Sequence, residues 1–234
     1  MIRKLLGLGK KQNKTVEIDK SMKVAFVGAD HSGKSSLIEI LAGIFIDKGI
    51  RTNIFSKDIY NKISAKQDES LDHDESIYVD EKLRVLNNDV GTGGCFLDKS
   101  QDSISIYEYK IEDLFTLNRQ LTYADKIVII QDLDVDSAQI NQVAFNDENI
   151  AIVFNKFIVS KVKLKHFEMI YGKKNVENAL VNNMDMNLYR ASVNSKLSKD
   201  LMKYSEVGEE TIRNMEYLCD WILDGVIKDD AEMA

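Results

Sequence analysis

The residues best suited to chemistry form a loop bounded by glycine near the start of the chain. Residues 28–35 read Gly-Ala-Asp-His-Ser-Gly-Lys-Ser and fit the phosphate-loop pattern G-x-x-x-x-G-K-[ST]. In this pattern the backbone N–H groups turn toward a phosphate, and the helix that follows adds the positive end of its dipole. Lys34 would carry a charge to the β- and γ-phosphates, and the Ser35 hydroxyl would ligate Mg²⁺. The spacing predicts a nucleotide site at this loop.

The segments on either side of the phosphate loop agree with this prediction. The apolar run at residues 24–27 favours a strand before the loop, and Leu37, Ile38 and Leu41 follow helical spacing after it. Further along the chain, β-rich runs alternate with helical patterns. Strands are expected near residues 22–27, 51–56, 83–86, 103–107, 126–131, 150–154 and 176–181, and helices near 34–48, 111–121, 136–144, 163–171 and 209–224.

This alternation predicts an α/β fold, with a mainly parallel β-sheet and helices on both faces in the three-layer arrangement of P-loop NTPases. A ligand of such a sheet binds beyond the carboxyl ends of the strands, where the phosphate loop lies. The 234 residues, 44% of them hydrophobic, suffice for one core. We expect one domain over residues 22–226, between a basic amphipathic leader and linker at 1–21 and an acidic tail at 227–234.

Composition narrows the classes of partner. The formal net charge of −7 argues against a protein that coats DNA, for which the sequence gives no support. The chain has only two cysteines, which fits a reduced, cytoplasmic protein.

In residues 1–14, Ile2, Leu5 and Leu6 share a helical face beside several Lys and Arg residues. Two interpretations remain open for this segment. It could bind peripherally to the inner face of a membrane or dock in a groove of a partner protein, or it could be a frayed leader.

Two further segments attract attention. Residues 57–82 are polar with few apolar anchors, which predicts a long surface loop or a mobile switch region. Asp72-His73-Asp74 within it has no accompanying ligand cluster, so we interpret it as solvated loop rather than a metal site. The glycine-dense run at residues 89–94 favours a flexible turn over a second phosphate-binding loop.

The order of motifs resembles that of the ParA/MinD family of dimerising ATPases. Besides the phosphate loop, residues 123–130 are similar to that family's "ADxVIIV" strand, and residues 151–156 to its "IVxNK" strand end. The stretches 189–192 and 204–208, followed by an amphipathic helix, resemble the closing segment of MinD-like members. The resemblance implies ATP and Mg²⁺ as cofactors, and a homodimer or a protein partner.

Three positions depart from the family pattern. Ala29 stands where the family's signature lysine reaches across the dimer. Of the two aspartates that usually end the second strand only Asp58 is present, so the alignment makes it the candidate to orient water or organise Mg²⁺. Tyr107 replaces the carboxylate expected after the third strand, and Glu108 could serve only if its side chain turns inward. Weak or absent hydrolysis is therefore expected.

The candidate residues follow from the loop and the resemblance. Lys34 and Asp58 are the candidate catalytic residues, and Ser35, Asp58 and Glu108 the candidate metal ligands. The candidate nucleotide-binding residues are Gly28, Asp30, His31, Ser32, Gly33, Lys34, Ser35, Ser36, Asn155 and Lys156. The Asn155 amide could read a purine edge or cap a helix, and the stem of Lys156 could lie along the base.

Four functions compete on these residues. The first is an ATP-binding switch of the MinD/ParA kind that positions or regulates a larger cellular machine. A P-loop kinase for a nucleotide or another small molecule is disfavoured because the few arginines form no cluster for a lid. A GTPase is disfavoured because Ile158 occupies the position of the guanine-reading acid. The fourth is a non-hydrolysing interaction scaffold with the same fold.

Overall fold

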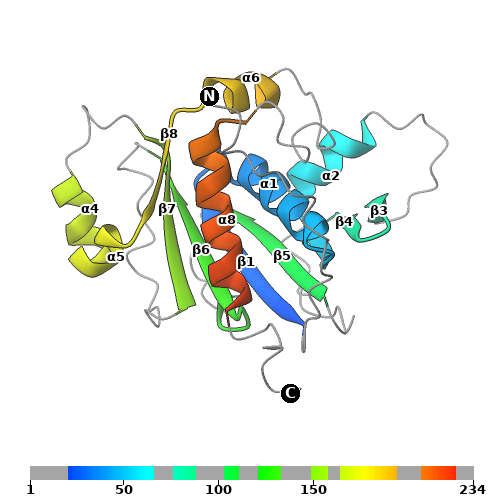
Figure 1. Cartoon of the computed structure of the whole chain (residues 1–234), viewed down its shortest axis with the longest axis horizontal. Coiled ribbons are helices and arrows are strands. Elements are labelled where there is room, and N and C mark those ends of the chain that lie inside the picture. Colours follow the sequence, from blue (N-terminus) through cyan, green and yellow to red (C-terminus); the bar gives the residue numbers. More distant parts are fainter. Residues whose placement is uncertain are drawn as a thin grey trace, which may run out of the picture.

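The computed structural model describes residues 21–65, 76–87, 103–110, 121–132, 149–157, 164–193 and 207–224. Its strands form one eight-stranded sheet in the order β3-β4-β2-β5-β1-β6-β7-β8 (Figure 1). The strands are β1 Met22–Gly28, β2 Arg51–Phe55, β3 Ser76–Asp80, β4 Leu83–Leu86, β5 Ser103–Lys110, β6 Lys126–Gln131, β7 Ile150–Phe157 and β8 Leu180–Asn183. The helices are α1 Lys34–Asp47, α2 Lys57–Ser64, α4 Leu164–Tyr171, α5 Lys173–Glu177, α6 Met186–Val193 and α8 Glu209–Leu223.

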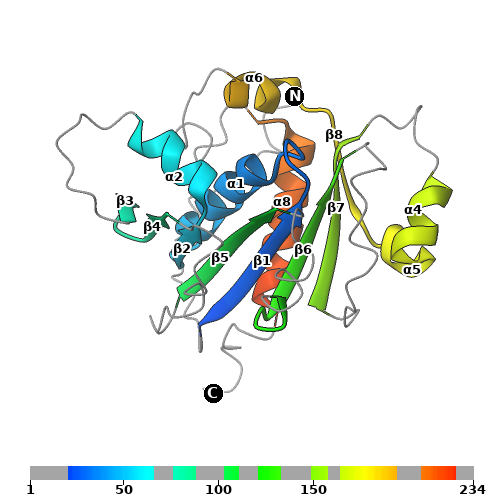
Figure 2. The ribbon, with the colours of Figure 1, turned by 180° about the vertical axis from the view of Figure 1, so that it is seen from behind.

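The pairing confirms the predicted, mainly parallel sheet. Every strand pair is parallel except β3 with β4, which are antiparallel and joined by a short turn at residues 81–82. Because β1 lies between β5 and β6, the phosphate loop leaves from the middle of the carboxyl edge. Both ribbon views place α2 and α6 at that edge, beside the β1–α1 loop (Figures 1 and 2).

Side-chain alternation along the strands builds a core on each face of the sheet. In β1, Val24 and Phe26 belong to the cluster that includes α1 and α8, and Ala25 and Val27 to the other. Phe167 of α4 and a residue of α5 lie in that second cluster. Helices therefore contribute to the cores on both faces, as predicted.

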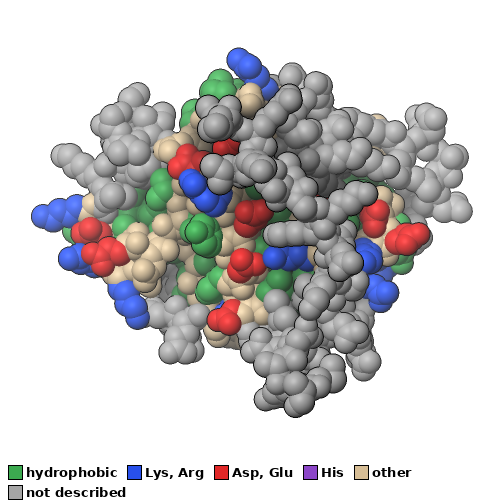
Figure 3. Space-filling view, viewed as in Figure 1, with side chains coloured by type: hydrophobic (Ala, Val, Ile, Leu, Met, Phe, Trp, Pro, Cys, Tyr) green, Lys and Arg blue, Asp and Glu red, His purple; other side chains and the backbone are tan. Residues whose placement is uncertain are grey.

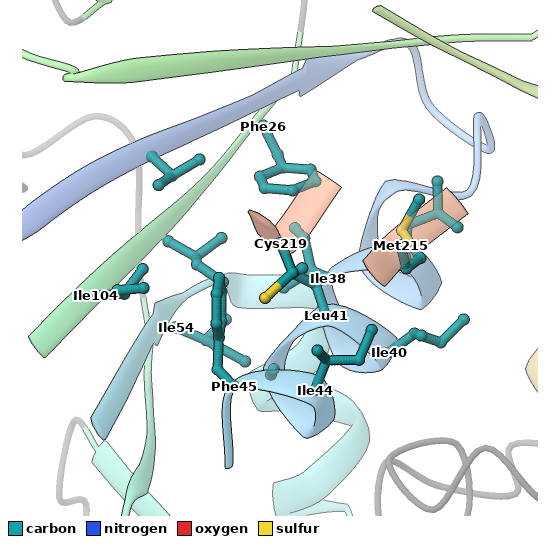
Figure 4. Close-up of a cluster of buried hydrophobic side chains, with 14 of the residues drawn as sticks. Phe26, Ile38, Ile40, Leu41, Ile44, Phe45, Ile54, Ile104, Met215 and Cys219 are labelled. Atoms are coloured by element: carbon teal, nitrogen blue, oxygen red, sulfur yellow. The ribbon is translucent and has the colours of Figure 1, made fainter. Parts of the chain in front are cut away.

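The helix that follows the phosphate loop is buried almost all round. Its residues Leu37, Ile38 and Leu41 are completely inaccessible. Helix α8 packs against α1, and Figure 4 shows Ile38 and Leu41 close to Cys219 of α8. The thiol of Cys219 on α8 lies in this cluster, and burial raises its pKa to about 12. Because most of its residues are buried, α1 packs inside the protein and is firmly held there.

Residues 57–82 correct one prediction. They are not a continuous loop, because α2 occupies 57–64 and β3 occupies 76–80. The Ser56 hydroxyl accepts a hydrogen bond from the Ile59 N–H at 3.0 Å and so caps α2. Ile59 and Ile63, four residues apart, are both buried and give this short helix its packed face.

The predicted strand at 176–181 is also shifted. Residues 173–177 form α5, and the strand β8 begins only at residue 180. The predicted helices at 111–121 and 136–144 lie wholly or almost wholly outside the described residues. So do the leader, the acidic tail, the Asp72-His73-Asp74 run and the glycine-dense run at 89–94.

Two surface properties bear on partners. Within the described ranges, no helix has both the length and the apolar character needed to span a bilayer. On the face that carries α1 and α8, the described acidic and basic side chains are interspersed and do not gather into a basic area (Figure 3).

Candidate functional site

Two glycines let the phosphate loop fold tightly against the strand ends. At Gly28, a Cβ atom would lie 2.5 Å from the backbone oxygen of Ile130. Gly33 has φ +91°, and a Cβ there would lie 2.3 Å from the side-chain nitrogen of Asn155. Between them His31 also adopts a left-handed backbone, with φ 62°. The loop therefore needs glycine at both ends of the motif.

Lys34 is folded back into the loop. Its ammonium donates hydrogen bonds to the backbone oxygens of Gly28 and Ala29, each at 2.7 Å, and only 4% of the residue is exposed. Burial lowers the pKa of Lys34, whereas the carboxylates of Glu108 and Asp30 oppose that shift. The backbone of the loop itself thus holds the Lys34 ammonium.

Glu108 turns inward and joins two elements of the site. Its Oε1 accepts a hydrogen bond from the Ser35 hydroxyl at 2.7 Å, and its Oε2 accepts one from Ser56. Ser35 lies in the first turn of α1, and Ser56 follows β2 as the cap of α2. One carboxylate at the end of β5 therefore connects the phosphate loop with α2.

The alternation along β5 explains why Glu108 points into the site and Tyr107 does not. Ile104 and Ile106 belong to the core shared with α1, and Glu108 continues that side of the strand. Tyr107 faces the opposite core, where its ring stacks on Phe55 with centroids 4.4 Å apart. The carboxylate therefore comes one residue later than position 107, where the family resemblance placed it, and its side chain still lies beside Ser35.

A pocket of about 590 Å³ opens in front of these groups. It gathers most of the candidate residues onto one surface, with Gly28 and Ser32 behind it in the loop. Its lining comprises Asp30, His31, Gly33, Lys34, Ser35, Ser36, Asp58, Asn61, Lys62, Glu108, Asn155, Lys156, Met184, Asp185, Leu188 and Tyr189. The phosphate loop, α2, the end of β7 and the β8–α6 segment thus meet at one cavity.

Asn155 and Lys156 brace the phosphate loop from β7. The Asn155 side-chain nitrogen donates a hydrogen bond to the Ser32 oxygen at 2.8 Å, and the Lys156 ammonium donates one to the His31 oxygen. Lys156 itself has a left-handed backbone, with φ 57°. Both residues line the pocket, and their contact with a base stays a prediction.

Asp185 is a site residue that the sequence analysis missed. Its Oδ1 accepts the backbone N–H groups of Asn187 and Leu188 at 3.0 Å each, which caps α6. Its Oδ2 accepts the Gly208 N–H at 2.7 Å, next to the start of α8. An aspartate just before a helix was the available signal, but its link to α8 depends on the tertiary fold.

The oxygen groups of the pocket suit Mg²⁺, which also takes phosphate and water ligands. They suit less well a metal ion that binds through protein ligands alone. The described residues contain no group of three or more His, Cys, Asp or Glu side chains able to hold an ion. Mg²⁺ commonly takes one or two protein oxygens and completes its shell with phosphates and water. The Ser35–Glu108 pair and Asp58, which lines the same pocket, supply oxygens of that kind.

A second buried carboxylate lies behind the pocket wall. Glu39 on α1 is 1% exposed, and its Oε1 lies 3.7 Å from the ammonium of Lys62. Burial raises the pKa of Glu39 from 4.5 to about 7, against the opposing charge of Lys62. Sequence analysis missed this pair, since nothing in the sequence shows that α1 and α2 meet here.

The raised pKa predicts how stability depends on pH. The protonated carboxyl favours the folded state, so its contribution is complete below pH 4.5 and is lost as pH rises through 7. Glu39→Gln removes the titrating group. Its free energy of unfolding, relative to that of the wild type, should increase by about 2 kcal/mol from pH 5.5 to pH 8. Urea unfolding at the two pH values measures this, and a constant difference would contradict the assignment.

The comparison with known proteins identifies the fold. Neither protein-family models nor curated protein sequences match the chain. A MinC:MinD cell division protein complex from Aquifex aeolicus matches with TM-score 0.59 and 12% identity, over 85% of this chain and 96% of that one. MinD from Pyrococcus horikoshii OT3, complexed with Mg-ADP, matches with TM-score 0.58 and 11% identity, over 85% and 96%.

A third solved structure agrees with these two. A protein assigned to plasmid partition in Borrelia burgdorferi B31, bound to AMPPNP, matches with TM-score 0.56 and 15% identity, over 88% of this chain and all of that one. At such identities the similarity shows the fold. The chain has the fold of ParA/MinD ATPases, as its motif order predicted.

Proposed function

We propose that the chain is an ATP-binding switch protein that positions or regulates a larger cellular machine. The observation that carries this proposal is the Lys34 ammonium inside a glycine-bounded loop, next to the Ser35–Glu108 pair. A buried ammonium in a loop of this sequence pattern suits phosphates, and the paired oxygens suit Mg²⁺. The solved structures of like fold, two of them named with AMPPNP or Mg-ADP, support the same assignment.

The residues present would divide the work of binding. Lys34 and the backbone of residues 28–35 would hold the phosphates, and Ser35 with Glu108 would hold Mg²⁺. The metal, when bound, neutralises charge on the phosphates. Met184, Leu188 and Tyr189 give the β8–α6 side of the pocket apolar surface against which a base could lie. The pocket thus offers a charged end and a more apolar end.

The switch would act through α2. Glu108 bonds both Ser35, at the phosphate end of the site, and Ser56, the cap of α2. A ligand that changes the Ser35–Glu108 contact therefore acts on the start of α2. Differential affinity of ATP and ADP for two arrangements of this contact would shift their populations.

Hydrolysis is expected to be weak and to depend on Asp58. Asp58 is exposed on the first turn of α2 and lines the pocket. From there it would orient a water toward the terminal phosphate of a bound nucleotide. Asp58→Ala should leave Mg·ATP affinity within about threefold and remove phosphate release. Single-turnover assays with radiolabelled ATP measure both quantities. Phosphate release at the wild-type rate would exclude Asp58 as a catalytic group.

Partners and location are the remaining parts of the proposal. A cytoplasmic protein that binds a second copy of itself or another protein under control of ATP would fit the switch. Residues 1–14, which lie outside the described part of the chain, would add peripheral contact with a membrane through their basic and apolar side chains.

Calorimetric titration with Mg·ATP, Mg·ADP and Mg·GTP, combined with light-scattering mass under each nucleotide, tests the proposal. We expect ATP to bind at least as tightly as GTP, and the mass or the partner affinity to change between ATP and ADP. Rapid transfer of phosphate to a small molecule would favour the kinase. Nucleotide binding without turnover or any change in mass would favour the scaffold. No binding of any nucleotide would refute the assignment.

A further inference from the structure

Helix α2 forms one wall of the pocket, and this wall carries Lys62, which the proposed nucleotide site does not use. Asp58, Asn61 and Lys62 all line the pocket. Their spacing of three and four residues places them on one face of α2, whereas Ile59 and Ile63 pack against the core. The Lys62 side chain is 36% exposed, so its ammonium is accessible to a ligand.

Lys62 is held only loosely by its partner. The 3.7 Å between its ammonium and Glu39 Oε1 exceeds hydrogen-bond length. That carboxylate oxygen is buried and has no hydrogen-bond donor among the described residues. A buried carboxylate without a donor is poorly satisfied, and an ammonium at this distance keeps most of its capacity to donate.

The other pocket lysines are already engaged. Lys34 donates to two backbone oxygens of the phosphate loop, and Lys156 donates to the oxygen of His31. The described residues of the pocket carry three lysines against four carboxylates, namely Asp30, Asp58, Glu108 and Asp185. A triphosphate adds further negative charge, so an additional cation beside Lys34 would have a large effect on its binding.

We propose that Lys62 is a second phosphate-binding cation, which moves from Glu39 to the terminal phosphate when a nucleoside triphosphate fills the pocket. The proposal rests on the ATP site described above. The loop cannot supply this charge from position 29, because that residue is alanine. A lysine on α2 would instead connect the presence of the terminal phosphate to the helix that Glu108 and Ser56 already join to the site.

This arrangement gives Lys62 and Glu39 opposite effects on affinity. Without Lys62 a triphosphate loses one charge contact that a diphosphate never makes. Without the charge on Glu39, Lys62 no longer has to leave a carboxylate to reach the phosphate. The effect of Glu39→Gln must therefore disappear when Lys62 is also replaced.

Calorimetric titrations with Mg·AMPPNP and Mg·ADP at pH 8, where the Glu39 carboxyl carries its charge, test the proposal on the full chain. Lys62→Met should weaken AMPPNP binding about tenfold and ADP binding less than about twofold. Glu39→Gln should strengthen AMPPNP binding about threefold, and the double variant should match Lys62→Met. Equal losses for both nucleotides in Lys62→Met, or weaker AMPPNP binding in Glu39→Gln, would overturn the proposal.

Lys57→Met is the matched control, because Lys57 lies on the same helix and does not line the pocket. If Lys62→Met does not fold, the double variant still decides, since it removes both charges of the pair together. The double variant should still lose AMPPNP affinity selectively. Suppose that the wild type and the control bind both nucleotides, and that the double variant binds each of them as tightly as the wild type does. The proposal for Lys62 is then wrong, and the ATP site stands. If wild type binds neither, the ATP site itself fails.

Discussion

Lys34→Ala should bind Mg·ATP at least about 100-fold more weakly than the wild type. The ammonium of Lys34 lies inside the phosphate loop, on the backbone oxygens of Gly28 and Ala29, and is almost completely buried. A phosphate in the loop would meet this charge in surroundings where water screens it little. Alanine removes the charge and leaves two backbone oxygens facing the phosphates.

Calorimetry with Mg·ATP measures the effect of Lys34→Ala. Lys57→Ala serves as the control, because it removes an exposed lysine of α2 that does not line the pocket. Thermal unfolding of both variants establishes that the fold is kept. Wild-type affinity in a folded Lys34→Ala protein would place the nucleotide elsewhere.

Glu108→Gln should change affinity in opposite directions with and without metal. In Mg²⁺, we expect ATP to bind about tenfold more weakly, because the carboxylate beside Ser35 is lost as a ligand or as a partner of its water shell. In EDTA, we expect ATP to bind more tightly to the variant by a similar factor of about ten, because the carboxylate no longer repels the phosphates.

The opposite signs of the two effects, weaker ATP binding in Mg²⁺ and tighter binding in EDTA, make Glu108→Gln a decisive test. Glutamine keeps the size of the side chain and a partner for Ser35 and Ser56, so the loss of charge is the main change. Glu81→Gln, in the exposed turn between β3 and β4, provides the control, because it makes the same chemical change at a residue that does not line the pocket. Equal shifts of affinity in both buffers would show that Glu108 acts on the structure of the loop and not on a metal.

Regular hydrophobic patterns made much of the fold predictable. The strands β4 and β6 and the starts of α1 and α8 fall at their predicted residues, because long apolar runs and helical spacing mark them. By contrast, α2 was missed because it is short and mostly polar, and Ile59 and Ile63 are its only fully buried residues. The Ser56 cap was the local signal that could have identified it.

The inward orientation of Glu108 could have been predicted from the alternation of side chains along β5. The alternation of Ile104, Ile106 and Glu108 already places the carboxylate on the face of α1, one residue after the position that the resemblance indicated. The Tyr107 ring is thereby free to pack on the other face. Reading β5 by its period of two would have settled the orientation of Glu108.

The Glu39–Lys62 pair and the links made by Asp185 could not be predicted in this way. The Glu39–Lys62 contact and the Asp185–Gly208 hydrogen bond each join groups more than twenty residues apart, so their meeting depends on how the helices pack in the fold. In a single sequence Glu39 is one more acidic residue of a helix. Only the fold shows that it is buried and faces a pocket-lining lysine.

The most direct test of the ATP site is a crystal structure of the full chain grown with Mg·AMPPNP. We expect the β- and γ-phosphates within hydrogen-bond distance of the backbone N–H groups of residues 30–35 and of the Lys34 ammonium, with Mg²⁺ on Ser35. A nucleotide bound away from this loop, or a loop that stays closed on Lys34 at saturating nucleotide, would contradict the account.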